Sequence, residues 1–211
     1  MTRHGTRRNI ATLVGALGLV FSMIAGPAEA ADKGMIEVSK DVAKEKGVIG
    51  VADFDMQGNL ALPEGYRQWV FVGAPVTPNE LNDGKAAFPE FHHVYIDPVS
   101  FKQYQETGNF RDGTVIVKEL VTVGAKKSAS GNGYFPGEFT DLGVSVKDAS
   151  RFAKEAGNWG FFHFSAEGGK SLPPTAKALP ATACSACHQQ NAAQDLVFTQ
   201  HYPVLRAAKP K

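Results

Sequence analysis

The sequence predicts a mainly β protein of the α+β class, in which an antiparallel sheet body is followed by a C-terminal helix that carries a Cys-x-x-Cys-His motif. Short runs rich in aromatic and β-branched residues, separated by turn residues, indicate the sheet. The tail indicates the helix, because its apolar residues change to a helical spacing after Thr182.

The first thirty residues are typical of a secretory leader. Three arginines give a basic start, an apolar run covers residues 11–25, and Ala28-Glu29-Ala30 provides small residues for a peptidase. The apolar run is too short to remain as a membrane-spanning helix. We therefore expect residues 1–30 to be a signal peptide and residues 31–211 to form one exported domain.

Charge and hydropathy exclude several classes of partner. The chain has 22 Lys and Arg against 21 Asp and Glu, and the leader holds three of the basic residues and one of the acidic ones. A nearly neutral mature chain without a basic tract gives no reason to expect nucleic acid as a partner. After the leader, no apolar stretch approaches the ~20 residues of a membrane helix, so no membrane association is expected.

Six segments are predicted as strands, and in chain order they are Arg67–Val72, His92–Ile96, Thr114–Val123, Tyr134–Phe139, Val144–Val146 and Trp159–Phe164. Thr114–Val123 is the most strand-like run in the chain. Asn132-Gly133 is a dipeptide typical of tight hairpins, and we expect it to turn the chain back after this strand. Residues 76–89 and 167–180 are predicted loops, because turn-forming residues gather in them.

Short helices are predicted at Lys40–Lys46, Val99–Thr107 and Ala149–Ala156. The C-terminal helix is expected to run from Ala183 through Leu196, because the hydroxyl of Thr182 can cap its first turn. Pro203 is expected to end any continuation of this helix.

The motif indicates a covalently attached haem. Cys184 and Cys187 are the only cysteines, and on a helix their spacing places both thiols on one face, where they can meet the two vinyl groups of a porphyrin. His188 follows directly and can bind the iron. A thioredoxin-like redox pair would need a βαβ context, and a zinc site would need four ligands. The sequence therefore predicts haem c.

The sixth position of the iron is expected to be open. After the leader only Met35 and Met56 remain, and both precede the predicted sheet, so no methionine follows the motif. The other histidines of the mature chain are His92, His93, His163 and His201. A second histidine ligand would make the protein a six-coordinate electron carrier, and this alternative stays open.

Several segments resemble the cytochrome P460 family. They are Tyr66–Trp69, Phe88–His92, Asp112–Glu119, Gly131–Phe139, Gly157–Trp159 and Cys184–Tyr202. The resemblance covers Tyr66 to Arg206, and it implies a periplasmic, mostly β c-type haem protein that forms homodimers and has His as the proximal ligand. It also implies oxidation of hydroxylamine, with nitric oxide and nitrous oxide chemistry, and a periplasmic cytochrome as electron acceptor.

Lys118 is the residue that the resemblance assigns to a covalent bond with the porphyrin. The related cytochromes c′-beta lack that bond and bind gases such as nitric oxide without oxidising hydroxylamine. In the predicted strand, Ile116, Lys118 and Leu120 share one face, and burial there would favour a neutral, nucleophilic amine. The alternative is a solvent-facing lysine paired across the hairpin with Glu138.

A base must accept protons when hydroxylamine is oxidised. The resemblance implies a distal carboxylate close to Gly143, which has no side chain to provide one. Glu138 and Asp141 are the nearby carboxylates and our candidates for this catalytic role, with solvated strand-end residues as the alternative interpretation.

Overall fold

The computed structural model describes residues 50–166 and 171–211. The predicted leader and the helix predicted at Lys40–Lys46 lie outside the described residues. Within them, no helix is long and apolar enough to cross a membrane.

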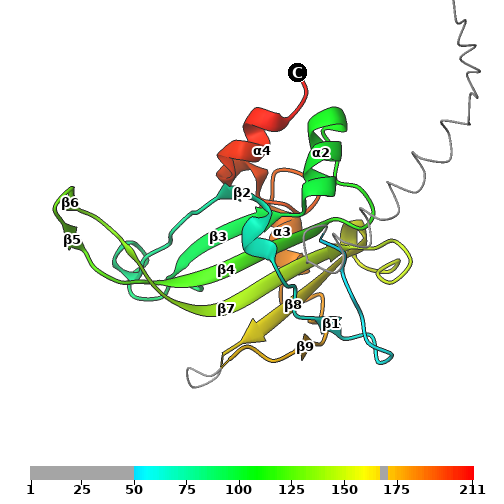
Figure 1. Cartoon of the computed structure of the whole chain (residues 1–211), viewed down its shortest axis with the longest axis horizontal. Helices are drawn as coiled ribbons and strands as arrows, with labels where there is room; N and C mark the ends of the chain where they lie inside the picture. The colour runs from blue at the N-terminus through cyan, green and yellow to red at the C-terminus, as the bar shows by residue number, and fades with distance from the viewer. Residues whose placement is uncertain (1–49, 167–170) are drawn as a thin grey trace, which may run out of the picture.

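A five-stranded antiparallel sheet forms the body of the molecule (Figure 1). Its strands, in spatial order, are β2 (Val70–Gly73), β3 (Phe91–Ile96), β4 (Val115–Val123), β7 (Pro136–Lys147) and β8 (Trp159–Ser165). Two small sheets accompany it, one of β1 (Leu60–Ala61) with β9 (Thr175–Ala176), the other of β5 (Lys127–Ser128) with β6 (Gly131–Asn132). The predicted mainly β class is confirmed.

The two faces of the sheet support two hydrophobic cores, because side chains alternate along each strand. One face, which includes Val94 and Ile116, packs against the C-terminal tail through residues such as Leu205. The opposite face, which includes Val117 and Val144, packs against the segments around β1 and β9. We call the first the tail face, since it carries the segment with the cysteine motif.

Besides two helices of the tail described below, the helical segments of the described residues are η1 (Tyr66–Gln68), η2 (Asn79–Leu81), α2 (Pro98–Thr107), η3 (Ala156–Asn158) and η5 (Thr199–His201). The helix predicted at Val99–Thr107 is confirmed as α2. Asp97 caps it by accepting the N–H of Ser100 at 2.8 Å, and Gly108 ends it at a positive φ of 71°.

Several predicted boundaries are wrong. The strand predicted at Tyr134–Phe139 begins only at Pro136, and it continues through Val144–Val146 as one strand, β7. It does so because β4 and β8 both pair with it and outweigh the weak strand propensity between the two predicted segments. Asn132-Gly133 is not the hairpin turn: Asn132 pairs with Lys127 in β6, and the chain turns at residues 129–130.

The strand predicted at Arg67–Val72 begins with the helical turn η1, because Gly65 enters it at a φ of 65°. The helix predicted at Ala149–Ala156 is absent from the described residues. Asp148 accepts the N–H groups of Ser150 and Arg151 at 2.9 Å, and this local bonding competes with a helix.

The C-terminal helix is confirmed but shorter than predicted. It is α3 (Ser185–Asn191), and Ala192 leaves it in an extended conformation. Pro203 begins the further helix α4 (Pro203–Ala208) rather than ending one, because proline is tolerated in the first turn, where its missing N–H has no partner to lose.

Candidate haem-binding site

Helix α3 positions the three residues of the motif. Cys184 is its N-cap, and the N–H of His188 bonds to the carbonyl of Cys184 at 3.1 Å. Both thiols are free, with Cys184 partly buried and Cys187 exposed. Burial raises the pKa of the Cys184 thiol, and the positive charge of Lys118 acts against this rise. The helix therefore presents two thiols and an imidazole within little more than one turn.

The imidazole of His188 is held in one orientation. Its Nδ1 lies 2.7 Å from the carbonyl oxygen of Leu196, and its ring packs between Phe161 and Phe198, each with a centroid separation of 4.7 Å. A carbonyl can only accept, so Nδ1 carries the proton and Nε2 is left with its lone pair. Burial lowers the pKa of His188, which favours the neutral, metal-binding form.

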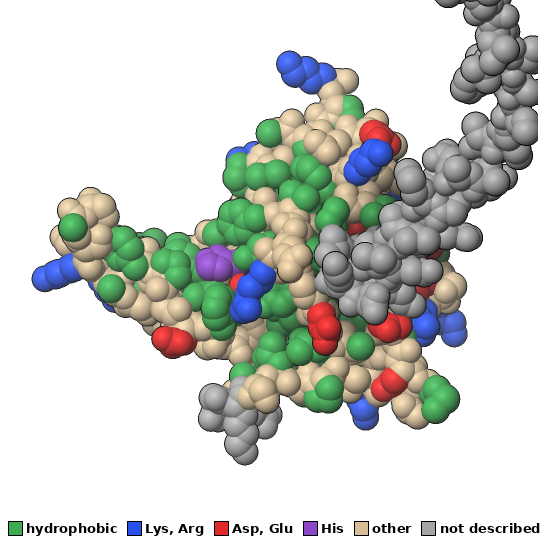
Figure 2. Space-filling view, viewed as in Figure 1, with side chains coloured by type: hydrophobic (Ala, Val, Ile, Leu, Met, Phe, Trp, Pro, Cys, Tyr) green, Lys and Arg blue, Asp and Glu red, His purple; other side chains and the backbone are tan. Residues whose placement is uncertain are grey.

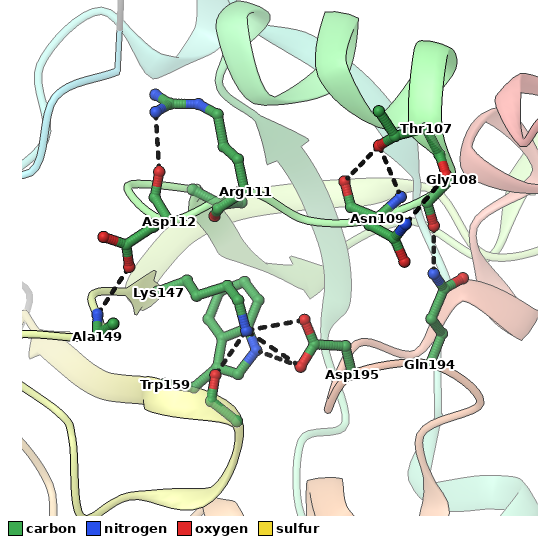
Figure 3. A network of polar contacts seen from close by, with 12 residues as sticks. Thr107, Gly108, Asn109, Arg111, Asp112, Lys147, Ala149, Trp159, Gln194 and Asp195 are labelled. Carbon is green, nitrogen blue, oxygen red and sulfur yellow. Dashed lines mark hydrogen bonds and ion pairs between the residues drawn. The ribbon is translucent and has the colours of Figure 1, made fainter.

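Asp195, the residue before Leu196, belongs to a polar network with Lys147 and Trp159 (Figure 3). Asp195 contacts Nζ of Lys147 at 3.0 Å and accepts the indole N–H of Trp159 at 3.2 Å. Asp195 and Leu196 have positive φ values of 46° and 59°, which non-glycine residues seldom adopt. The network holds this strained turn in place, and the turn aims the carbonyl at His188.

Lys118 lies on the tail face of β4, opposite Val94 of β3 and Gly143 of β7. Its Nζ is 3.9 Å from the centroid of the Phe88 ring. Burial lowers the pKa of Lys118, and negative charge at Cys184 opposes this most. The lysine and the thiols therefore influence each other electrostatically, although they are far apart in the sequence.

This register contradicts the alternative of a solvent-facing Lys118 paired with Glu138. The cross-strand neighbour of Lys118 is Gly143, and a Cβ at that position would lie only 3.3 Å from Cε of Lys118. Gly143 therefore leaves room for the lysine side chain to lie across β7.

The two candidate carboxylates are placed differently. Glu138 is exposed, and its backbone N–H bonds to the hydroxyl of Thr122 at 2.9 Å. In the pairing of β7 with β8, Asp141 lies opposite Ser165 and Gly143 lies opposite His163. Because Gly143 is also the partner of Lys118, the side chains of Asp141, His163 and Lys118 all face the tail side. The Asp141 carboxylate lies 3.6 Å from Nε2 of His163. Asp141 shares a sheet face with Lys118, whereas Glu138 points to solvent.

The remaining possible iron ligands have other surroundings. His93 faces away from the tail side and lies 3.9 Å from Glu119. His92 faces the tail side, with Nε2 3.2 Å from the carbonyl of Phe88. His201 stacks on Phe198, and Met56 is 98% exposed. Within residues 50–166 and 171–211, no three His, Cys, Asp or Glu side chains form a cluster that could bind a metal ion.

The residues at this site fit a c-type haem. The donor set has two free thiols, one imidazole with a fixed tautomer, and aromatic walls from Phe88, Phe161 and Phe198. A flat apolar macrocycle bonded through its edge needs these elements together. Cys184 and the His188 ring pack against the tail face, the face of the sheet that also carries Lys118.

Comparison with known protein families gives a match over most of the described chain. A family model described as cytochrome P460 matches residues 63–199, a range that contains Lys118 and the complete cysteine motif. No match was found among curated proteins.

Proposed function

Because the chain belongs to the cytochrome P460 family, a family of haem proteins, we propose that it is an exported c-type haem enzyme that oxidises hydroxylamine. Cys184 and Cys187 form thioether bonds to the porphyrin, and His188 binds the iron through Nε2. When bound, the haem would supply the redox chemistry of the reaction.

The proposal depends on one observation, namely that Lys118 and the cysteine motif lie on the same face of the sheet. An electron carrier attached through two thioethers and one histidine has no use for a partly buried lysine beside its thiols. A lysine with a lowered pKa, on the same sheet face as the cysteine motif, would be suited to form a third covalent bond to the porphyrin. That bond is the hallmark that the family resemblance implies.

The chain's own residues bind and orient the reacting groups. The Leu196 carbonyl fixes the orientation of the His188 ring, while Phe161 and Phe198 keep water from its faces. Oxidation of hydroxylamine releases protons together with electrons, so a base is needed on the open side. Asp141 is the sequence candidate that shares the Lys118 face, and His163 stands beside it as a second proton acceptor.

Two measurements test the proposal on the mature haem protein. Steady-state oxidation of hydroxylamine with an artificial electron acceptor should proceed, and mass spectrometry should find the Lys118 peptide joined to haem. Lys118→Met should lose the join, whereas Lys102→Met, an exposed lysine on α2, should keep it. An unmodified Lys118 in active protein would refute the crosslink. A colourless product, or pigment retained when both cysteines are replaced by alanine, would refute the haem assignment.

Gly143 favours a second candidate function. The family pattern implies a carboxylate close to this position, and the glycine opposite Lys118 provides none. A protein without that base would bind nitric oxide as the cytochromes c′-beta do, without turnover. Stoichiometric nitric oxide binding together with no hydroxylamine oxidation would identify this second function. A low-spin ferric spectrum would instead identify a six-coordinate electron carrier.

The proposal includes a periplasmic location, a periplasmic cytochrome as electron acceptor, and a homodimer. Exposed aromatic residues support the homodimer: Phe71 is 45% exposed and Phe139 57% exposed, and Arg67 lies 4.3 Å over the Phe139 ring. Hydrophobic side chains gather over the sheet on the face drawn in Figure 2. Light scattering should show a dimer that Phe71→Glu with Phe139→Glu converts to monomer; a monomeric parent would refute this part.

A further inference from the structure

Glu119 is a buried carboxylate on the sheet face opposite to the tail face. It follows Lys118 in β4, so side-chain alternation points it away from the candidate haem site. Its side chain is only 3% exposed, and a carboxylate so far from water needs polar partners. Neither the family resemblance nor the cysteine motif assigns a role to it.

The helical turn η1 supplies two of these partners. The hydroxyl of Tyr66 donates to Oε1 of Glu119 at 2.5 Å, and Nε of Arg67 donates to the same oxygen at 2.9 Å. Strand β3 adds His93, whose Nδ1 lies 3.9 Å from Oε2, and Tyr95, whose ring centroid lies 5.7 Å from that of Tyr66. The guanidinium of Arg67 is 55% exposed, so the ion pair that balances the Glu119 charge extends to solvent.

Tyr66 has a proton acceptor within hydrogen-bond reach. Burial, and secondly the hydrogen bond to Glu119, raise the pKa of Tyr66, so the phenol stays protonated at neutral pH. A neutral phenol gives up an electron most readily when its proton leaves too, because the alternative is a positive charge on a partly buried ring. A carboxylate at this distance can accept that proton without movement of either side chain.

Tyr104 is a matched counter-example on the tail face. It is fully buried in the core that packs around the tail, and its hydroxyl donates to the amide oxygen of Gln194 at 3.1 Å. An amide oxygen accepts a hydrogen bond but is a poor base, so this partner does not take the proton. The two tyrosines therefore differ in the chemistry of the acceptor.

We propose that Tyr66 is a redox-active tyrosine, which gives one electron to the haem after a peroxide has oxidised it, while Glu119 accepts the phenol proton. The proposal rests on the proposed function in one respect, namely that haem is bound. Lys118 and Glu119 are consecutive in β4, with Cα atoms about 3.8 Å apart, so a single layer of backbone separates the two faces between which the electron passes.

One electron and one proton leave Tyr66 in this step. The phenol O–H bond breaks, an O–H bond forms on Oε1 of Glu119, and the electron reduces the oxidised haem by one equivalent, which leaves a neutral tyrosyl radical. Each hydrogen peroxide accepts two electrons and two solvent protons and becomes two water molecules, so one peroxide oxidises two Tyr66 side chains in turn. The oxidising equivalent thereby leaves the porphyrin, which is protected from degradation.

Electron paramagnetic resonance of the ferric haem protein, frozen shortly after mixing with hydrogen peroxide, tests the proposal. The parent should give a tyrosyl signal that narrows when the protein carries ring-deuterated tyrosine. Tyr66→Phe should lose this signal, whereas Tyr104→Phe should keep it. The Soret band of Tyr66→Phe should also bleach faster under peroxide, because the oxidising equivalent then stays on the porphyrin.

Glu119→Gln separates proton acceptance from packing. Glutamine keeps the shape of the side chain and an acceptor oxygen for Tyr66, but it does not take the proton, so the radical signal should be lost. Water can solvate the exposed Arg67 in this variant. In the parent itself, radical formation should be slower in D2O, a measurement that needs no substitution. A radical of full yield in Glu119→Gln, or equal rates in the two solvents, would exclude Glu119 as the acceptor.

Three results overturn the assignment of Tyr66. One is a signal that survives in Tyr66→Phe, and its disappearance in Tyr95→Phe would then assign it to Tyr95. The others are a signal lost in Tyr104→Phe and a coloured parent without any tyrosyl signal. All three leave the haem assignment and the oxidation of hydroxylamine standing, because neither depends on Tyr66. A colourless parent would instead refute the proposed function, and the redox role of Tyr66 with it.

Discussion

Replacing Asp195 should change the proposed iron site, although Asp195 is not one of the residues proposed to bind the haem. Asp195→Ala removes the contact with Lys147 Nζ at 3.0 Å and the hydrogen bond from Trp159 at 3.2 Å. Hydrogen bonds to charged groups each contribute about 1.5–3 kcal/mol, and alanine at the positive φ of 46° adds about 1 kcal/mol of strain. Because such contributions overlap, we expect the free energy of unfolding to fall by about 3 kcal/mol.

The same change should reach His188 through the neighbouring residue. If the turn relaxes, the Leu196 carbonyl moves from its position 2.7 Å from Nδ1, and the imidazole loses its hydrogen-bond acceptor. A weaker acceptor makes the histidine a weaker donor to iron, so the iron–imidazole stretching band of the ferrous haem protein should move to lower frequency.

Urea unfolding and resonance Raman spectra of the same samples check both effects. Asp195→Asn tolerates the positive φ and keeps an acceptor for Trp159, so it should cost about 1 kcal/mol and leave the band nearly unshifted. The exposed Asp53→Ala serves as the control. Two results would refute the coupling between Asp195 and His188. One is a loss of unfolding free energy below about 0.5 kcal/mol in Asp195→Ala; the other is the full loss together with an unchanged iron–imidazole band.

Three further predictions concern the sheet. Burial, and secondly the charge of Lys118, lower the pKa of His92 from 6.5 to about 4. The unfolded chain therefore takes up a proton first, and the free energy of unfolding should fall by about 3 kcal/mol as the pH drops through this range. His92→Gln should flatten that loss in urea titrations at several pH values. Tyr66→Phe removes a hydrogen bond to the Glu119 carboxylate, which is 2% exposed, and should cost about 2 kcal/mol by the same method. Gly143→Ala places a Cβ 3.3 Å from Lys118 Cε and should reduce the fraction of Lys118 joined to haem, as measured by mass spectrometry.

The central strands could be predicted because their local composition and their tertiary environment agree. Val115–Val123 is rich in β-branched residues and is paired on both sides. In Pro136–Lys147 the two disagree, since Gly137, Asp141 and Gly143 have low strand propensity. That strand forms because β4 and β8 offer partners on both edges, and pairing of this kind is not visible in a local pattern.

The candidate site, like the sheet, could be predicted only in part. Cys184, Cys187 and His188 stand together in the sequence, and their spacing is enough to indicate a haem. The Leu196 carbonyl had no signal, because any residue supplies a carbonyl and only the turn decides where it points.

The sequence by itself indicated a haem and determined the strand that presents Lys118, since both depend on residue types at short, fixed spacings. Only the tertiary structure decided that Lys118 and the cysteine motif lie on the same face of the sheet, and that a strained turn holds His188. The physical reason is that contacts between distant segments depend on sheet register and on the packing of the tail. A shift of one residue in β4 would move Lys118 to the opposite face while every local pattern stayed the same.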